Sequence, residues 1–167
     1  MIPLCEKDQQ ATLGNFTINL NAKSWGHSQI FGSVQRYGNS ATIVYSKDLT
    51  TCWRRFVVAK ELSHLMFDDT EDFTKDPIEL VASLLAGIPL SDGARASVTS
   101  EQHAVLMAIE LILPHSCRKV IEAMSASGSS ALKIATKFMV PEKVVETYLN
   151  LGYKKMAADC WELRGNS

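Results

Sequence analysis

The first part of the chain alternates apolar and polar residues, which is the pattern of strands that bury one face. The alternation runs through residues 13–20, and two further extended stretches, residues 29–36 and 41–46, flank the turn Tyr37-Gly38-Asn39-Ser40. We therefore predict a small antiparallel sheet near the N-terminus. Apart from this β-rich character, residues 1–40 receive no more specific assignment.

The spacing of apolar residues changes after Thr50 to intervals of three and four residues, which is typical of a helix with one face in the core. The sequence predicts that this helix extends to Phe67. Two positions of its core stripe are ionisable, and both lie near its C-terminal end. The stripe consists of Trp53, Phe56, Val57, Lys60, His64 and Phe67.

Start and stop signals predict further helices. Asp76-Pro77-Ile78-Glu79 combines an N-cap, a first-turn proline and a capping-box glutamate, and Gly87 ends that segment. A third helix is expected over residues 101–113, where Pro114 ends a largely apolar segment. A helix over residues 117–124 and a group of C-terminal helices within residues 131–167 follow. These elements predict an α+β fold, with the small sheet packed on a mostly helical body.

Composition narrows the class of protein. The chain has 167 residues, of which 46% are hydrophobic and 21% are charged, and this favours a single domain over residues 1–167. The formal net charge of −1 gives no overall attraction to nucleic acid or to anionic lipid. The longest apolar run, residues 80–90, is shorter than the roughly 20 residues of a membrane span.

Cysteine usage indicates a reducing compartment. The four cysteines form no Cys-x-x-Cys pair, and no secretory signal pattern precedes them. We therefore expect a cytoplasmic protein with reduced thiols, which are Cys5, Cys52, Cys117 and Cys160.

The candidate chemistry lies in Lys60-Glu61-Leu62-Ser63-His64. Residues four apart on a helix share a face, so Lys60 and His64 point the same way. In the motif His-Glu-x-x-His, two histidines at this spacing bind zinc and the glutamate acts as general base. This chain has the second histidine as His64 and the glutamate as Glu61, but Lys60 takes the place of the first histidine.

The surroundings of this motif resemble the ImmA/IrrE-type zinc metallopeptidase family. Residues 54–65 are similar to that family's signature R-R-F-T-L-A-H-E-L-G-H, and two later blocks, residues 101–114 and 134–152, are similar to its downstream helices. The resemblance covers roughly residues 41–152. It implies a zincin-like metallopeptidase fold and a regulatory activity, since known active members cleave a partner repressor.

The resemblance also implies site residues. Glu61 corresponds to the catalytic base and His64 to a metal ligand. The position of the family's third ligand, a glutamate, aligns with His103, and Glu101 is a further candidate near the same helix start. A zinc site needs at least three protein ligands, so this set is marginal.

Lys60 has two interpretations. In the first, its ammonium repels a metal ion, occupies the metal position and pairs with a core carboxylate, so that zinc is absent or weakly bound. In the second, its stem lies on the apolar stripe while its head reaches solvent. The carboxylates considered as partners are those of Glu61, Glu79, Glu101 and Glu110.

These features favour a metallopeptidase-like regulatory protein that is catalytically impaired and that binds a protein partner, such as a transcriptional repressor, through the former substrate groove. One alternative is an active zinc endopeptidase with Glu61 as base. A second is a DNA-associated regulator that uses the helix-turn-helix-like residues 134–152. Glu142 and Glu146 on its second helix disfavour phosphate contact, so we expect neither nucleic acid nor a membrane as partner.

Overall fold

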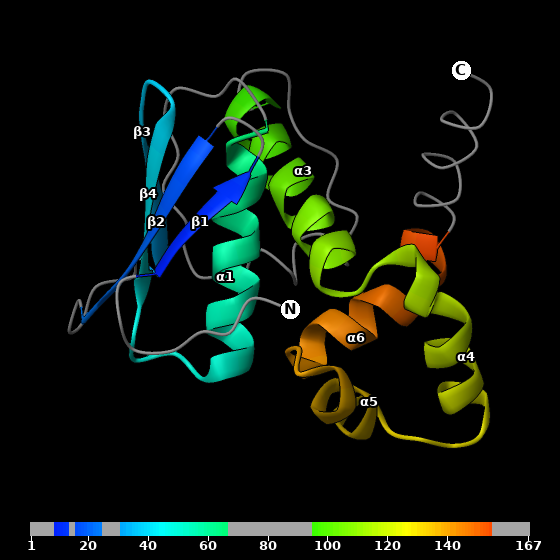
Figure 1. The fold of residues 1–167 in the computed structure, drawn as a ribbon. Helices are drawn as coiled ribbons and strands as arrows, with labels where there is room; N and C mark the ends of the chain where they lie inside the picture. The colour runs from blue at the N-terminus through cyan, green and yellow to red at the C-terminus, as the bar shows by residue number, and fades with distance from the viewer. Residues whose placement is uncertain (1–8, 14–15, 25–30, 67–94, 155–167) are drawn as a thin grey trace.

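The computed structural model describes residues 9–13, 16–24, 31–66 and 95–154, in which strands come first and helices follow (Figure 1). This arrangement agrees with the predicted α+β class. The strands are β1 (Gln9–Leu13), β2 (Phe16–Lys23), β3 (Gly32–Tyr37) and β4 (Ser40–Ser46). The helices are α1 (Thr51–His64), α3 (Arg95–Ile112), the short 3-10 helix η1 (His115–Cys117), α4 (Arg118–Ala126), α5 (Ala131–Phe138) and α6 (Glu142–Leu149).

The four strands form one mixed sheet in the order β1-β2-β4-β3. The pairs β1–β2 and β3–β4 are antiparallel, but β2 and β4 run parallel, with Thr17 opposite Ser40. The prediction of a wholly antiparallel sheet was therefore wrong. Alternation of apolar residues specifies which side of a strand is buried, but not the direction of its neighbour. Gly38, with φ of 54°, starts the tight turn that joins β3 to β4.

Helix α1 lies between the sheet and α3 (Figure 1). The Thr50 hydroxyl caps its start by accepting from the Trp53 amide, an interaction that typically contributes about 1 kcal/mol. On one side, Val57 and Val58 pack with the buried residues of the sheet. On the other side, Phe56 packs with α3 and the C-terminal helices. Because both sides are covered, even the ionisable residues Lys60, Glu61 and His64 of α1 are buried.

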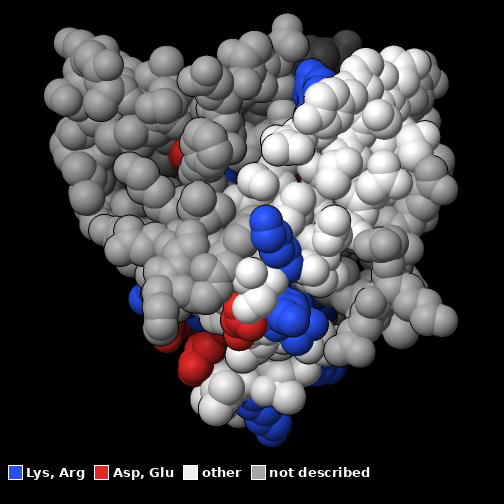
Figure 2. All heavy atoms as spheres, turned by 90° about the vertical axis from the view of Figure 1, so that its left-hand side faces the viewer, with Lys and Arg blue, Asp and Glu red and all other residues white. Residues whose placement is uncertain are grey.

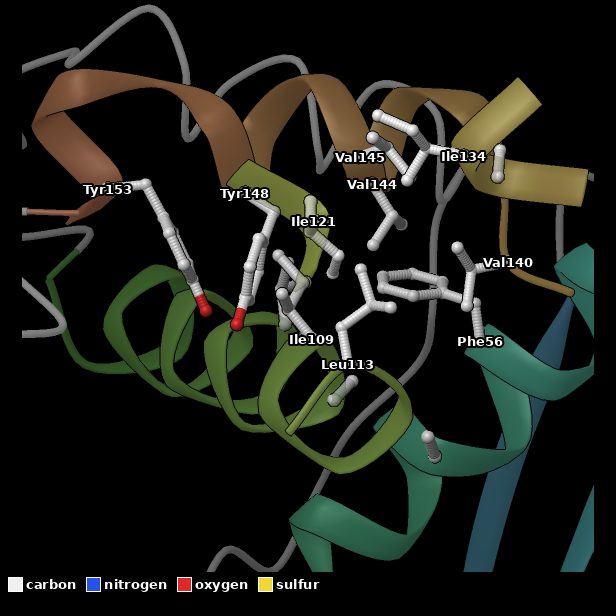
Figure 3. Packing of buried hydrophobic residues seen from close by; sticks show 14 residues of the cluster. Phe56, Ile109, Leu113, Ile121, Ile134, Val140, Val144, Val145, Tyr148 and Tyr153 are labelled. Carbon is white, nitrogen blue, oxygen red and sulfur yellow. The ribbon is translucent and has the colours of Figure 1, made fainter. Parts of the chain in front are cut away.

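The larger core lies between α1, α3 and the C-terminal helices (Figure 3). Tyr148 and Tyr153 close one end of it, with their hydroxyl groups directed toward α3. The Tyr153 hydroxyl donates to Glu110 Oε1 at 2.8 Å. The other labelled members of this core are Phe56, Ile109, Leu113, Ile121, Ile134, Val140, Val144 and Val145.

The predicted helices agree with the structure in position more closely than in their boundaries. Helix α3 begins at Arg95, six residues before the predicted start, and α1 ends at His64 rather than at Phe67. The predicted helix over residues 76–87 lies outside the described residues. Within the described ranges, no helix combines the length and apolar character needed to cross a bilayer.

One face of the molecule, on the sheet side, carries lysine, arginine, aspartate and glutamate side chains close together (Figure 2). Among the residues described on this face, the charges gather in its lower half, and both signs are present. The residues described on this face do not form a continuous basic surface, which is the usual electrostatic feature of a nucleic-acid interface.

Candidate functional site

Four ionisable side chains meet between α1 and α3. Lys60, Glu61 and His64 come from the last turns of α1, and Glu101 comes from α3. Lys60 and Glu61 are fully buried, and His64 is 3% exposed. The Glu101 side chain is 13% exposed and is the most accessible member of the group. We call these four residues the Lys60 cluster.

The Lys60 ammonium lies at the centre of this cluster. Its Nζ atom is 2.8 Å from Glu101 Oε2, 3.0 Å from Glu101 Oε1 and 3.0 Å from His64 Nε2. Glu61 Oε1 is farther away, at 3.7 Å. An ammonium buried in a protein requires paired carboxylates and hydrogen-bond acceptors to offset the loss of hydration. The contacts with Glu101 and His64 supply both.

The geometry also restricts the proton positions in the cluster. An ammonium carries only donors, and His64 Nε2 lies 3.0 Å from Lys60 Nζ and 3.3 Å from Glu101 Oε1. His64 Nε2 therefore accepts from the lysine in one tautomer and donates to the carboxylate in the other. For Glu101, burial is the largest influence and raises the pKa, but the contacts with His64 and Lys60 together lower it by more. The pKa of Glu101 therefore lies below its usual range, which favours the carboxylate.

This depressed pKa predicts an acid-sensitive fold. Stability that depends on a carboxylate with a lowered folded pKa is present above its unfolded pKa of about 4.3 and is lost as the pH falls toward the folded value. We expect the free energy of unfolding of the wild type to exceed that of Glu101→Gln above about pH 5, and the difference to narrow progressively as the pH falls below about 4. Urea denaturation across pH 3–7 measures this difference.

The control for this measurement is Glu146→Gln, which changes an exposed ion pair with Lys143. Its effect should stay small at every pH because exposed pairs contribute little. If the stability difference between the wild type and Glu101→Gln does not change with pH, the Glu101 carboxylate is not what stabilises the cluster.

Glu61 lies on the side of α1 that faces strand β3. Gly32 begins this strand, and a Cβ atom built there would overlap Val57 and lie 3.0 Å from Glu61 Oε1. Only a glycine lets the strand backbone approach α1 this closely. The close approach covers Glu61, which is why its carboxylate is fully buried.

Arginine side chains fix both ends of α1. Near its start, Arg55 donates to the carbonyl oxygens of Phe138 and Met139, where α5 ends. Just beyond its end, Arg36 donates to the Leu65 carbonyl oxygen at 2.6 Å. These hydrogen bonds satisfy carbonyl groups that helix ends leave without intrahelical partners. They tie α1 to strand β3 on one side and to the α5–α6 turn on the other.

The structure brings together some of the predicted site residues and separates others. Glu61, His64 and Glu101 meet around Lys60, as described above. His103 follows Glu101 in α3 by two residues, and its side chain is exposed. Two residues correspond to about 200° of helix rotation, so Glu101 and His103 point in nearly opposite directions. Glu101, and not His103, is therefore the α3 side chain that contacts Lys60 and His64.

Of the described carboxylates considered as partners of Lys60, that of Glu101 lies closest to its ammonium, at 2.8 Å. The interpretation in which its head reaches solvent is wrong, because no part of the residue is exposed. Glu110 instead contacts Tyr153 and, at 3.5 Å, Arg118. Glu79 lies outside the described residues. The sequence analysis did not identify the close approach at Gly32 or the hydrogen bonds from Arg55 to the end of α5. For Arg55, the only indication in the sequence was the pair of arginines before Phe56.

The donor set around Lys60 does not fit a zinc ion in this arrangement. The atoms suited to coordinate it, His64 Nε2 and the Glu101 oxygens, contact the ammonium. A divalent cation at the same point would have to displace or deprotonate Lys60. Among the described residues, no group of three or more histidine, cysteine, aspartate or glutamate side chains has metal-binding geometry.

Comparison with known proteins identifies no family. No family model matches the chain, and a search of curated proteins finds no match. The relation to ImmA/IrrE-type peptidases therefore stays a proposal that depends on the residues themselves.

Proposed function

We propose that this chain is a regulatory protein related to ImmA/IrrE-type zinc metallopeptidases, with a zincin-like fold, in which Lys60 replaces the metal and catalysis is impaired. Its role is to bind a protein partner, such as a transcriptional repressor, through the surface that corresponds to the family's substrate groove. The partner assignment derives from the resemblance alone.

The position of the Lys60 ammonium is the observation that carries this proposal. It lies 3.0 Å from His64 Nε2 and 2.8 Å from Glu101 Oε2, one helical turn before His64. An ammonium there offers a single positive charge and hydrogen-bond donors, but no orbital that could accept a ligand. The carboxylate and the imidazole keep their contacts, so the local fold is stabilised without a metal ion.

Elemental analysis of protein purified without a chelator tests the proposal. We expect less than one zinc per chain, because the charge of Lys60 opposes a divalent cation. A repressor partner mixed with the protein should be bound and recovered uncleaved. The matched variant is His64→Ala, in which any zinc held by this cluster would be lost.

Stoichiometric zinc that disappears in His64→Ala would overturn the proposal in favour of the active zinc endopeptidase. In that case the purified protein should also cleave its partner. Zinc that remains in His64→Ala would have to be bound elsewhere, and it would leave the proposal standing.

A further inference from the structure

The outward face of α5 combines apolar and basic side chains. Leu132 and Met139 are 58% and 45% exposed. Thr136 lies between them, at a spacing of four and three residues, and its hydroxyl donates to the Leu132 carbonyl oxygen. Its methyl group is thus the part left for contact. We call these three exposed residues, of which Met139 lies just past the helix end, the apolar stripe. Covering these apolar side chains would remove apolar surface from water, which favours binding.

Two lysines lie beside this stripe. Lys133 and Lys137 are both exposed and one helical turn apart. Within the part of the chain that the structure describes, neither forms an ion pair, whereas Lys143 pairs with Glu146 and Lys154 pairs with Glu122, each at 3.0 Å. The outward face of α5 therefore keeps its positive charge. We call Leu132, Lys133, Thr136, Lys137 and Met139 the α5 face.

The α5 face is held rigidly. Met139 adopts a left-handed conformation with φ of 54°, which is strained for a residue other than glycine. The Val140 amide donates to the Ala135 carbonyl oxygen and the Met139 amide to that of Thr136, which completes the helix end. Arg55 of α1 binds the Met139 carbonyl. A glycine at position 139 would relieve the strain but would lack the exposed apolar side chain. The strained residue therefore contributes the Met139 side chain to the α5 face.

We propose that the α5 face is a docking surface for an acidic, amphipathic segment of a partner protein. Apolar side chains of the segment would cover Leu132 and Met139, and its carboxylates would pair with Lys133 and Lys137. Charge complementarity and the exposed apolar stripe carry this assignment. The surface is separate from the Lys60 cluster, so the proposal does not depend on the function proposed above.

Other classes of partner fit the face less well. Nucleic acid would gain little from Leu132 or Met139, because a phosphate backbone offers no apolar side chains to cover them. A membrane surface would require a larger apolar area than one helix of eight residues offers. A protein segment uses both the lysines and the apolar stripe.

Fluorescence anisotropy with a synthetic peptide tests this proposal. The probe is a labelled helical peptide of about 14 residues with leucines at three- and four-residue spacing and glutamates beside them. We expect saturable binding at about 10–100 µM in low salt, weakened in high salt. A matched peptide with glutamine in place of glutamate should bind at least about tenfold more weakly.

Two variants of the chain locate the site. Lys133→Glu with Lys137→Glu, and separately Leu132→Ser with Met139→Gly, should each weaken binding by at least about tenfold. The matched control is Lys119→Glu with Val120→Ser on α4, which changes an exposed lysine and an exposed apolar residue outside the α5 face and should leave binding unchanged. Thermal melts followed by circular dichroism establish that each variant is folded.

The proposal is overturned if the acidic peptide shows no saturable binding, or if the α4 control weakens binding as much as the α5 variants do. It is also overturned if duplex DNA or phosphatidylglycerol vesicles bind more tightly than the peptide through the same two lysines. Concentration-dependent dimerisation that the Lys133→Glu and Lys137→Glu pair abolishes would assign the face to a second copy of this chain instead.

Discussion

Lys60→Met should lower the free energy of unfolding by about 3–5 kcal/mol. Methionine fills a similar volume, so the loss comes from electrostatics rather than from a cavity. The substitution leaves the buried carboxylates of Glu61 and Glu101 without the ammonium that offsets their desolvation. Glu101→Gln in the same chain should restore part of this loss, and the further change Glu61→Gln should restore more. Urea denaturation followed by tryptophan fluorescence measures each difference.

An exposed ion pair with a similar distance serves as a control that separates the effect of burial on stability from the effect of charge pairing alone. Lys143 and Glu146 are 3.0 Å apart, close to the Lys60–Glu101 distance, but their side chains are 37% and 46% exposed. Lys143→Met should therefore cost no more than about 1 kcal/mol. In a double-mutant cycle, Lys60 and Glu101 should couple by more than about 1 kcal/mol. Coupling below about 0.5 kcal/mol would mean that the ammonium does not stabilise the cluster.

Lys60→His should raise the affinity for zinc by at least about a hundredfold, because the substitution adds a ligand and removes a repelling charge. For comparison, mutation of residues that only hydrogen-bond to metal ligands changes metal affinity by about 10–100-fold. The new imidazole would join His64 and Glu101, giving two histidines and a glutamate, a ligand set known from zinc enzymes. Titration against a chromophoric chelator measures the affinity. Zinc should also raise the melting temperature of this variant, since binding to the folded state stabilises it.

Three companion variants identify the source of any gain. Lys60→Gln removes the charge without adding a ligand and should gain much less affinity. Glu101→Gln added to Lys60→His should abolish most of the gain, whereas His103→Ala added to Lys60→His should leave it intact, because His103 is exposed. The reverse pattern, with loss in His103→Ala only, would place the third ligand on the opposite side of α3 and contradict the arrangement described here.

The sequence was sufficient to predict the fold class and the burial of α1. Its apolar stripe at three- and four-residue spacing placed Phe56 and Lys60 in the core, and both are fully buried. The sequence could not supply the direction of β4, because β2 and β4 satisfy their alternating pattern equally well as parallel or antiparallel neighbours. The start of α3 was also misplaced, since the predicted start at residue 101 lies inside a longer helix that begins at Arg95.

The candidate site shows a similar division. The one-turn spacing of Lys60 and His64 follows from helix geometry, so their contact could be predicted from sequence. The sequence could not indicate whether Glu101 or His103 lies beside Lys60, because both residues are in the same helix and differ only in the side that they face. Their orientation depends on how α3 is rotated against α1. Only tertiary packing fixes that rotation, here through contacts such as those of Phe56 with the α3 core.

The mixed sheet has a consequence for the order in which the chain folds. Strands β3 and β4 join through a tight turn at Gly38, whereas β2 must pair with β4 across a much longer separation, with Thr17 opposite Ser40. Closing the longer loop costs more entropy, so the β3–β4 hairpin should form first and β2 should add to it later. Since Glu61 lies against Gly32 in that hairpin, its carboxylate would be enclosed early, before α3 brings Glu101 to Lys60.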